Sequence, residues 1–333
     1  MSLAKLKNLL EAFDGLRIAV IGDVILDHYI WGDVGRISPE APVPLVDVSE
    51  ENHRLGGAAN VALNLGTLGV KTSLFGRIGG DAGGKQLQGM FKEASIAWQG
   101  NLAADVPDTI VKSRVVARNQ QLCRLDREGR RSDYALDAAS WESLLEDILT
   151  GAQAVLLSDY AKGVIDDNLL GVLKKKALKM HLPVFCDPKP RYARDFGGLT
   201  LLTPNRGEAI QMSEVEWDPK ESFPAEKIVE GIYERYRPKY LVITLGSAGM
   251  LYAENGRIGG VVPTFAREVY DVSGAGDTVV AVLSAAILGG ASLSEAVSVA
   301  NVAAGIVVGK LGTATADLEE ILTFAVDHWS GTE

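Results

Sequence analysis

The sequence has few of the residues that stabilise very small folds or bind zinc, with two cysteines and four histidines among 333 residues. Cys123 and Cys186 are far apart, so they can build neither a disulfide framework nor a CxxC metal pair. The histidines do not have the spacing of zinc ligands. These absences exclude a disulfide-stabilised module and a zinc-binding domain.

Long hydrophobic runs are also missing. The longest, from Val279 to Leu288, includes Ser284 and is too short to cross a bilayer, so it predicts a buried helix. The segment MSLAKLKNLLEAFDGL is amphipathic and lacks an apolar core followed by a small-residue cleavage site, unlike a secretory signal. We therefore expect a cytoplasmic protein with no membrane partner.

Positive charge is in deficit, because 33 basic residues face 43 acidic ones and the net charge is −10. This balance argues against nucleic acid as a partner. A composition of 47% hydrophobic and 23% charged residues excludes a disordered or fibrous chain. No linker or change of composition divides the sequence, so we expect one domain over residues 1–333.

Four short runs, AVLLS, PVFC, LTLLT and YLVIT, are almost entirely apolar and alternate with segments of helical periodicity. Strands buried on both faces of a parallel sheet have this composition, so the pattern predicts an α/β fold with a mostly parallel sheet flanked by helices. Such sheets bind ligands beyond the carboxyl ends of their strands. Asp23, Asp159, Asp187 and Asn205 follow such strands, and we expect them at one rim.

Two segments do not fit this central sheet. The stretch from Trp31 to Val48 contains three prolines, which exclude a central strand and favour an extended edge. Thr109 to Leu125 alternates loosely and predicts two half-exposed strands. We expect these segments, at about residues 29–48 and 109–126, to form a small sheet that stands away from the core.

The sharpest local signal is DVSGAGDTVVAVL, from Asp271 to Leu283. Unpaired N–H groups at a helix start favour an anion, and glycine lets a ligand approach the backbone. Asp277 adds a carboxylate in the same first turn. The alternative is an ordinary N-cap, which is worth about 1 kcal/mol. A cap needs one residue, whereas the small residues from Ser273 to Gly276 favour a ligand site.

Two further motifs each have a functional and a structural interpretation. In LTPNRGEA, Asn205 and Glu208 share a helical face and suit Mg²⁺ through water, although the same pair fits a capping box, which we favour for the motif alone. In TLGSAGMLY, Gly246, Ser247 and Gly249 follow a strand and offer donors to phosphate. A tight hairpin loop explains this second motif equally simply, and we favour it for the motif alone.

The segments GDVILDHY and GGAAN combine short carboxylate and amide side chains with glycines, which suits polyol hydroxyls or, with equal weight, turns and helix caps. The segment GGDAGGKQ nearly matches a P-loop, but Gln86 has no hydroxyl for Mg²⁺. No GxGxxG follows the first strand, which argues against a dinucleotide-binding dehydrogenase.

Taken in order, these motifs resemble those of the ribokinase-like (PfkB) carbohydrate kinases. The matching motifs are the early GD with a second aspartate, GGxxxN, the acidic strand ends, NxxE, TxGxxG and the late DxxGAGD, which is the most specific and reads DVSGAGD here. The resemblance implies a ribokinase-like fold with a small β lid over the sugar. It also implies ATP and Mg²⁺ as cofactors, with a monovalent cation as an optional addition.

The resemblance also implies roles for individual residues. Asp277 would accept the proton of the attacking sugar hydroxyl, and the N–H groups of Gly274, Ala275 and Gly276 would stabilise the transferring phosphoryl group. Asn205 and Glu208, with Arg206 and Gly207 between them, would hold the Mg²⁺ water network beside the nucleotide. The nucleotide would further contact Thr244, Gly246, Ser247, Gly249 and Asn301, and the sugar would contact Asp23, Asp27, Gly56, Gly57 and Asn60.

Within the family, the sequence resembles the heptose 7-phosphate kinases of lipopolysaccharide core synthesis. The segments that carry this likeness are GRISPEAPVPLV, RLGGAANVALNLGTLG, RVVARNQQLCRLD, LSDYAKGV, DPK and EVYDVSGAGDT. The implied reaction is phosphorylation of the C1 hydroxyl of D-glycero-D-manno-heptose 7-phosphate to the 1,7-bisphosphate, a step towards ADP-heptose. Many such kinases are fused to a cytidylyltransferase-like domain. Because no HxGH-type motif is present, we expect a stand-alone kinase or a kinase half.

A substrate that already carries a phosphate needs a cationic contact far from C1. Arg114, Arg118, Lys189 and Arg191 are candidates, although each could be a solvated surface charge. On the predicted lid, Asn119, Gln120 and Gln121 could contact the extra hydroxyls of a seven-carbon sugar.

We also expect a homodimer, because the edge of the lid would otherwise be exposed. Two alternatives to the heptose kinase stay open. One is another sugar or nucleoside kinase of the same fold, acting on ribose, fructose or a phosphofructose. The other is a catalytically silent sugar-binding or nucleotide-binding regulator, against which the intact Asp277 argues.

Overall fold

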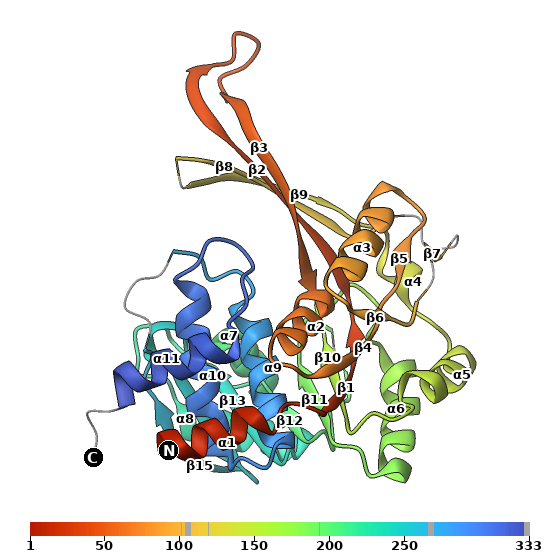
Figure 1. Ribbon diagram of the computed structural model, residues 1–333, viewed down its shortest axis with the longest axis vertical. Helices are drawn as coiled ribbons and strands as arrows, with labels where there is room; N and C mark the ends of the chain where they lie inside the picture. Colours follow the sequence, from red (N-terminus) through yellow and green to blue (C-terminus); the bar gives the residue numbers. More distant parts are fainter. Residues whose placement is uncertain (101, 104–107, 119, 193, 266–269, 330–333) are drawn as a thin grey trace.

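A nine-stranded sheet forms the centre of the computed structural model, which describes residues 1–100, 102–103, 108–118, 120–192, 194–265 and 270–329 (Figure 1). Its strand order is β15-β14-β13-β12-β11-β10-β1-β4-β6, and only β14 and β15 run antiparallel to their neighbours. The predicted mostly parallel sheet is therefore confirmed. The strands are β1 (Arg17–Gly22), β4 (Lys71–Phe75), β6 (Ala97–Trp98), β10 (Ala154–Ser158), β11 (Val184–Asp187), β12 (Leu201–Leu202), β13 (Tyr240–Thr244), β14 (Met250–Glu254) and β15 (Arg257–Val262).

Helices cover both faces of this sheet because successive side chains of its inner strands point to opposite faces. In β1, Ile18 and Val20 pack into one hydrophobic cluster, and Ala19 and Ile21 pack into the other. The first cluster includes α1 (Leu3–Glu11), α2 (Ala58–Thr67), α3 (Ala82–Glu93), α9 (Ala275–Leu288), α10 (Leu293–Val308) and α11 (Leu318–Trp329). The second includes α4 (Arg131–Tyr134), α5 (Ala138–Ile148), α6 (Asp167–Met180), α7 (Arg206–Ser213) and α8 (Ala225–Tyr236).

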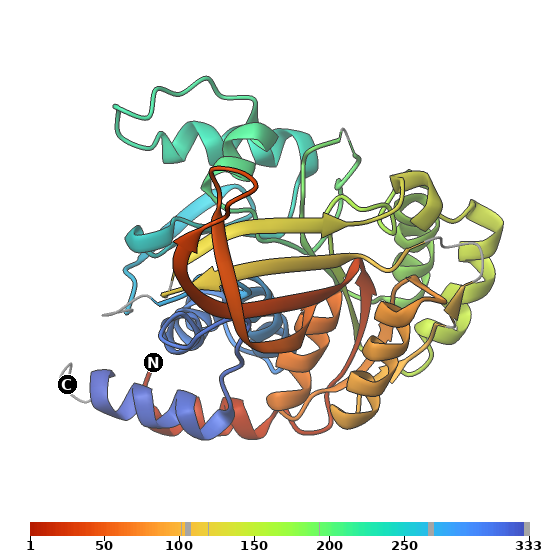
Figure 2. The same ribbon diagram turned by 90° about the horizontal axis from the view of Figure 1, so that it is seen from above.

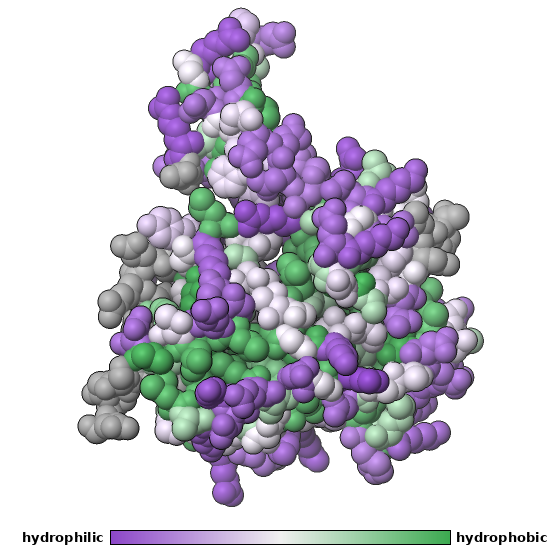
Figure 3. Space-filling model, in the orientation of Figure 1, coloured by the Kyte–Doolittle hydropathy of each residue, from purple (hydrophilic) through white to green (hydrophobic). Residues whose placement is uncertain are grey.

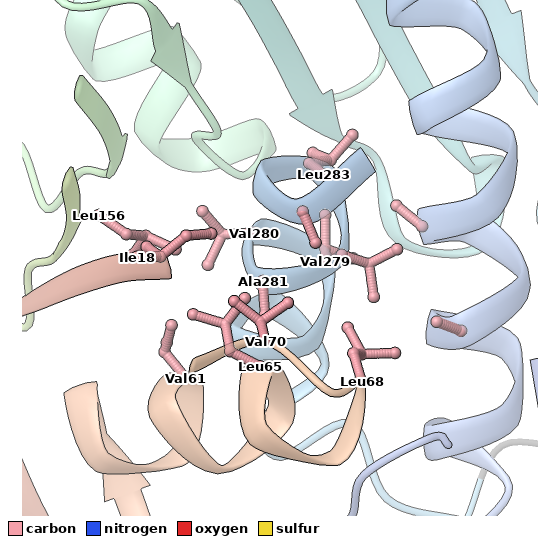
Figure 4. Packing of buried hydrophobic residues seen from close by; sticks show 14 of the residues in the cluster. Ile18, Val61, Leu65, Leu68, Val70, Leu156, Val279, Val280, Ala281 and Leu283 are labelled. Carbon is pink, nitrogen blue, oxygen red and sulfur yellow. The ribbon is translucent and has the colours of Figure 1, made fainter. Parts of the chain in front are cut away.

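Helix α9 lies at the centre of the first cluster. Every residue from Asp277 to Ala286 is buried, which confirms that the longest apolar run forms a buried helix. Figure 4 shows Val280 of α9 directed towards Leu156 of the sheet, and the side chains of α2, including Val61 and Leu65, packed beneath the helix. This packing fixes the body of the helix, whereas Ala275 and Gly276 at its start remain accessible. No helix in the described ranges is long and apolar enough to span a membrane.

A second sheet, the lid, stands away from the body (Figure 1) and crosses above it when seen from the end (Figure 2). Its order is β3-β2-β8-β9, formed by β2 (Val24–Ile37), β3 (Pro44–Gly57), β8 (Val111–Ala117) and β9 (Gln120–Arg127). A third, two-stranded sheet pairs β5 (Ile78–Gly79) with β7 (Leu102–Ala103).

The first lid segment is longer than the predicted 29–48, because its strands extend from Val24 to Gly57. The first residues of β2 are buried on both faces, so they lack the alternation that marks a half-exposed strand. Pro44 opens β3, where a missing N–H does not interrupt the ladder, and Pro42 precedes the strand. The prolines therefore mark the hairpin turn between two long strands.

The burial of α9 can be tested by shortening one of its side chains. Leu283 is fully buried, so Leu283→Ala should lower the free energy of unfolding by about 2–5 kcal/mol through lost burial and a cavity. The matched control is Leu178→Ala on α6, where the leucine is 77% exposed and the change should stay within about 0.5 kcal/mol. Urea unfolding measures both. A Leu283→Ala protein as stable as the wild type would contradict this packing.

Candidate active site

The acidic and polar residues that follow the parallel strands meet at one rim, as the sequence predicts. Asp159, after β10, donates its backbone N–H to the carbonyl of Asp187 at the end of β11 (3.1 Å). The Thr203 hydroxyl donates to the Asp187 carboxylate (2.9 Å). Beside them, Asn205 forms a parallel bridge with Thr244 at the end of β13. The carboxyl ends of neighbouring parallel strands thus form a continuous polar edge.

Asp277 lies at the centre of this edge, in the first turn of α9. Its Oδ2 accepts a hydrogen bond from Asn60 Nδ2 of α2, and its Oδ1 accepts one from the hydroxyl of Tyr160, both at 2.8 Å. Burial raises the pKa of Asp277 to about 6. The carboxylate is therefore ionised at neutral pH and remains close to the pKa that suits a general base.

The structure also decides against the N-cap interpretation of Asp277. The N-cap of α9 is Gly274, and no side chain caps the helix. Gly274 has a φ of +79°, and a Cβ there would lie 2.8 Å from Asn60 Nδ2. Glycine is required because the backbone turns in the left-handed region beside Asn60, which donates to Asp277. Of the three predicted N–H donors, Ala275 donates weakly to the Val272 carbonyl (3.3 Å).

Tyr160 is the main site residue that the sequence analysis did not assign. Two lysines contact its ring, with Lys112 Nζ 5.2 Å and Lys189 Nζ 5.9 Å from the ring centroid. Burial and the neighbouring Asp277 raise the pKa of Tyr160 well above its ordinary value, so the hydroxyl stays protonated and donates to Asp277. The sequence feature that could have identified Tyr160 is its position directly after the buried strand AVLLS and Asp159.

Asp23 requires a correction. It is fully buried, and its carboxylate accepts hydrogen bonds from the backbone N–H groups of Tyr160 (2.9 Å), Lys162 (2.9 Å) and Val164 (3.0 Å). The side chain therefore holds the loop that carries Tyr160, in place of the predicted contact with a sugar. The sequence could not show this because the loop lies far away along the chain.

The other predicted sugar-binding residues lie where the lid joins the body of the protein. Asp27 accepts a hydrogen bond from Arg114 Nη1 (2.5 Å). A Cβ on Gly56 would overlap the Asp27 carboxylate, and one on Gly57 would overlap the Asp23 carbonyl. These two glycines are therefore needed for close packing at the end of β3, and Gly57 is the N-cap of α2, in line with the helix-cap alternative. Asn60 donates to Asp277, so its amide orients that carboxylate.

A cavity of about 370 Å³ opens beside the first turn of α9. Its wall combines the small residues Ala275 and Gly276 with apolar side chains such as Val279 and Val308. This combination of an apolar wall and a helix N-terminus suits a ligand with both a flat apolar part and an anionic part. The predicted nucleotide-binding residues that line the same cavity are Thr244, Gly246, Ser247, Gly249 and Asn301.

The loop after β13 is both a hairpin turn and a wall of this cavity. It contains the short helix η1 (Gly246–Ala248) and leads into the antiparallel strand β14, so the hairpin interpretation is correct. Gly249 has a φ of +92°, which favours glycine. Arg206 Nη2 donates to the Leu245 carbonyl (2.9 Å), and Asn301 Nδ2 donates to the Pro263 carbonyl (2.5 Å). The first bond holds the loop against α7, and the second holds the segment after β15 against α10.

Asn205 and Glu208 form the capping box that the motif alone favoured. Asn205 Oδ1 accepts from the Glu208 N–H (3.0 Å), and Glu208 Oε2 accepts from the Asn205 N–H (2.8 Å), with Gly207 between them in the first turn. Glu208 Oε1 pairs with Lys189. These contacts occupy the oxygens that direct magnesium ligands would need, so the pair does not fit direct coordination. No group of three or more His, Cys, Asp or Glu side chains in the described ranges could hold a metal.

Three of the remaining residues that were predicted to contact the substrate lie away from Asp277. Arg118, whose side chain is 75% exposed, and the exposed Gln120 lie at the far turn of the lid, where Arg118 donates to the Val34 carbonyl (3.2 Å). Arg191 lines a separate surface hollow with Asp167. Sequence spacing could not show how far the lid extends from the body. Asn119 lies outside the described residues.

Solved structures with the same architecture define the class of the fold. Phosphofructokinase-2 from Escherichia coli, solved in complex with substrates and products, superposes with a TM-score of 0.74 at 19% identity, covering 94% of this chain and 98% of that one. Ribokinase from Arabidopsis thaliana, complexed with ribose and ATP, gives 0.69 at 20% identity, covering 93% and 98%. At this identity the likeness establishes the fold, which is ribokinase-like as predicted.

The family follows from the sequence itself. Residues 16–321 match the pfkB family carbohydrate kinase model, so the chain belongs to that family of sugar kinases. The bifunctional protein HldE of Magnetococcus marinus is 42% identical over 93% of this chain. That of Helicobacter pylori is 41% identical over 92%. The matches cover 64% and 65% of those relatives, so the chain spans about two thirds of their length.

The hydrogen bond from Tyr160 can be tested through the pH dependence of turnover. A general base at Asp277 would have to be ionised, so the rate should fall as pH drops through about 6. Tyr160→Phe removes a donor that stabilises the ionised carboxylate, so this acidic limb should move to higher pH by roughly 0.5 to 1 pH unit. Tyr192→Phe, at an exposed tyrosine, should leave the profile unchanged. An unmoved limb in Tyr160→Phe would refute the contact's role.

Proposed function

We propose that this chain transfers the γ-phosphoryl group of ATP to the C1 hydroxyl of D-glycero-D-manno-heptose 7-phosphate. The 1,7-bisphosphate and ADP are the products, and the reaction serves ADP-heptose synthesis. The observation that carries the proposal is the buried Asp277, whose pKa is near 6, at the N-terminus of a helix that also borders the candidate nucleotide cavity. The heptose assignment rests on the six sequence segments that resemble heptose 7-phosphate kinases and agrees with the likeness to HldE proteins.

The geometry supports a direct transfer. Asp277 accepts the proton of the C1 hydroxyl as its oxygen forms a bond to the γ-phosphorus. The bond from that phosphorus to the bridging oxygen breaks, and ADP leaves with the electron pair. In this proposal the N–H groups of the N-cap Gly274 and of Ala275 and Gly276 offset the charge of the transferring group, with Ala275 giving up its weak bond to the Val272 carbonyl. Phosphoryl transfer depends mainly on such positioning and electrostatic stabilisation.

Mg²⁺ accompanies ATP in this proposal and would neutralise phosphate charge. Asn205 and Glu208 contact it through water at most, because their oxygens already form the capping box and the pair with Lys189. We assign no step of the transfer to these two side chains. A cytoplasmic location belongs to the proposal, because ATP is the phosphate donor.

Removing the base tests the proposed chemistry. Asp277→Asn keeps the size of the side chain but cannot accept the proton, so kcat should fall by about 10²–10⁴-fold. Asp14→Asn, at an exposed aspartate before β1, should have wild-type turnover. ADP release assayed with heptose 7-phosphate measures both, and phosphorus NMR locates the new phosphate. Unchanged ATP consumption by Asp277→Asn would exclude Asp277 as the base, whereas turnover of ribose or fructose alone would refute the heptose assignment.

The lid also supports a homodimer, which we propose as the working form. Figure 3 shows a mostly hydrophilic lid surface interrupted by hydrophobic side chains. Ile37, Val43, Val48 and Leu125 are all more than half exposed there. The strands β3 and β9 also form the open edges of the sheet, and pairing would cover such edges.

The mass in solution tests this association. Light scattering after size-exclusion chromatography should give twice the mass of the 35.5 kDa chain at micromolar concentration. Ile37→Glu should shift the mass towards the monomer, because it introduces a charge among the exposed apolar side chains of the lid. A monomeric wild-type protein would refute the dimer while leaving the kinase proposal intact.

A further inference from the structure

The face of the lid that lies over Tyr160 carries a compact group of charged side chains. Across three neighbouring strands, Asp27 of β2 stands opposite Lys112 of β8, which in turn stands opposite Asp126 of β9. Two residues further along β8, Arg114 stands opposite Arg124 of β9. This register places Lys112 between two carboxylates that would ordinarily neutralise it.

Both of those carboxylates are already paired with arginines. Asp27 accepts from Arg114 at 2.5 Å, and Asp126 accepts from Arg124 at 2.8 Å. The nearby Lys162 pairs with Glu128. In the described part of the chain, Lys112 has no carboxylate oxygen within 4.0 Å of its ammonium group. Lys112 is therefore the cation of this group that has no counter-ion of its own.

The surroundings of Lys112 disfavour an unpaired charge. The side chain is half-buried, and burial lowers the pKa of its ammonium group. Lys162 and Arg124 lower this pKa further, and the attraction of Asp27 and Asp126 opposes the shift without reversing it. Burial takes away the water that stabilises the charged ammonium group, and an anion bound against Lys112 would stabilise that charge instead. Tyr160 also links the position of such an anion to Asp277. Lys112 Nζ contacts one side of the Tyr160 ring, and the hydroxyl of that ring contacts Asp277.

We propose that Lys112 binds the phosphate that the acceptor sugar already carries, and so selects phosphorylated sugars over uncharged ones. The inference rests on the proposed sugar-kinase function. Asp277 holds the acceptor hydroxyl at one end of the substrate, and Lys112, separated from it by one tyrosine side chain, holds the phosphate at the other. Lysine binds phosphate as a point charge, which suits a single contact without a second fork-like donor.

This assignment replaces the four cations predicted from sequence. Arg114 is committed to Asp27, and Lys189 is committed to Glu208. Arg118 lies at the far turn of the lid, and Arg191 lines a separate hollow. Lys112 was not among the candidates, because the sequence does not show that Asp27 pairs with Arg114 and Asp126 with Arg124.

The test compares Lys112→Met, Lys112→Arg and the control Lys175→Met, which changes an exposed lysine of α6. Calorimetry measures the binding of heptose 7-phosphate and of heptose without phosphate, and steady-state assays measure KM for ATP. Lys112→Met should weaken heptose 7-phosphate binding by about 10- to 100-fold, the usual effect of losing a charged hydrogen bond. It should leave heptose binding and KM for ATP unchanged. Lys112→Arg should retain most of the affinity, and Lys175→Met should retain all of it.

Equal losses for heptose and heptose 7-phosphate in Lys112→Met, or no loss for either, would overturn the inference. So would a wild-type protein that binds both sugars equally well. If the wild type binds heptose 7-phosphate but phosphorylates no sugar, the proposed function fails and the calorimetric comparison still decides the role of Lys112. Thermal unfolding of each variant verifies that the protein is folded.

Discussion

The position of the Asp277 carboxylate depends on three distant parts of the chain that meet at one point. Helix α9 carries the aspartate, α2 supplies Asn60, and the loop after β10 supplies Tyr160. Each donor stabilises the ionised carboxylate, whereas burial destabilises it, and the balance raises the pKa to about 6. The packing of α9 supports this balance, because every residue of the helix from Asp277 to Ala286 is buried.

Aspartates at the polar rim of the sheet hold the loops that surround Asp277. Asp23 accepts three backbone N–H groups and so holds the loop that carries Tyr160. Asp159 accepts from the N–H groups of Ala161 and Lys189 and pairs with the fully buried Arg194. Carboxylates at the ends of parallel strands therefore serve two purposes here. Asp23 and Asp159 organise loops, whereas Asp187 accepts the Thr203 hydroxyl beside Asp277 of helix α9.

The fold was largely predictable from sequence because its signals are local. Near-continuous apolar strands indicate a parallel sheet, and the run from Val279 to Leu288 indicates a buried helix. The extent of the lid was not predictable, because β2 begins inside the core, where alternation disappears. In the site, the glycine-lined start of α9 and the Thr244–Gly249 loop were identified, and both border one cavity. Tyr160 was missed, since a single tyrosine after a strand has no distinctive pattern.

The sequence by itself determined which segments are buried, where the chain turns, and that small residues precede the carboxylate of Asp277. These properties follow from composition and from spacing over a few residues. Only the tertiary structure decided which polar groups remain available. Asp23 and Glu208 are occupied by partners, whereas Lys112 forms no ion pair within the described ranges, because hydrogen bonds and ion pairs join residues that the fold alone brings together.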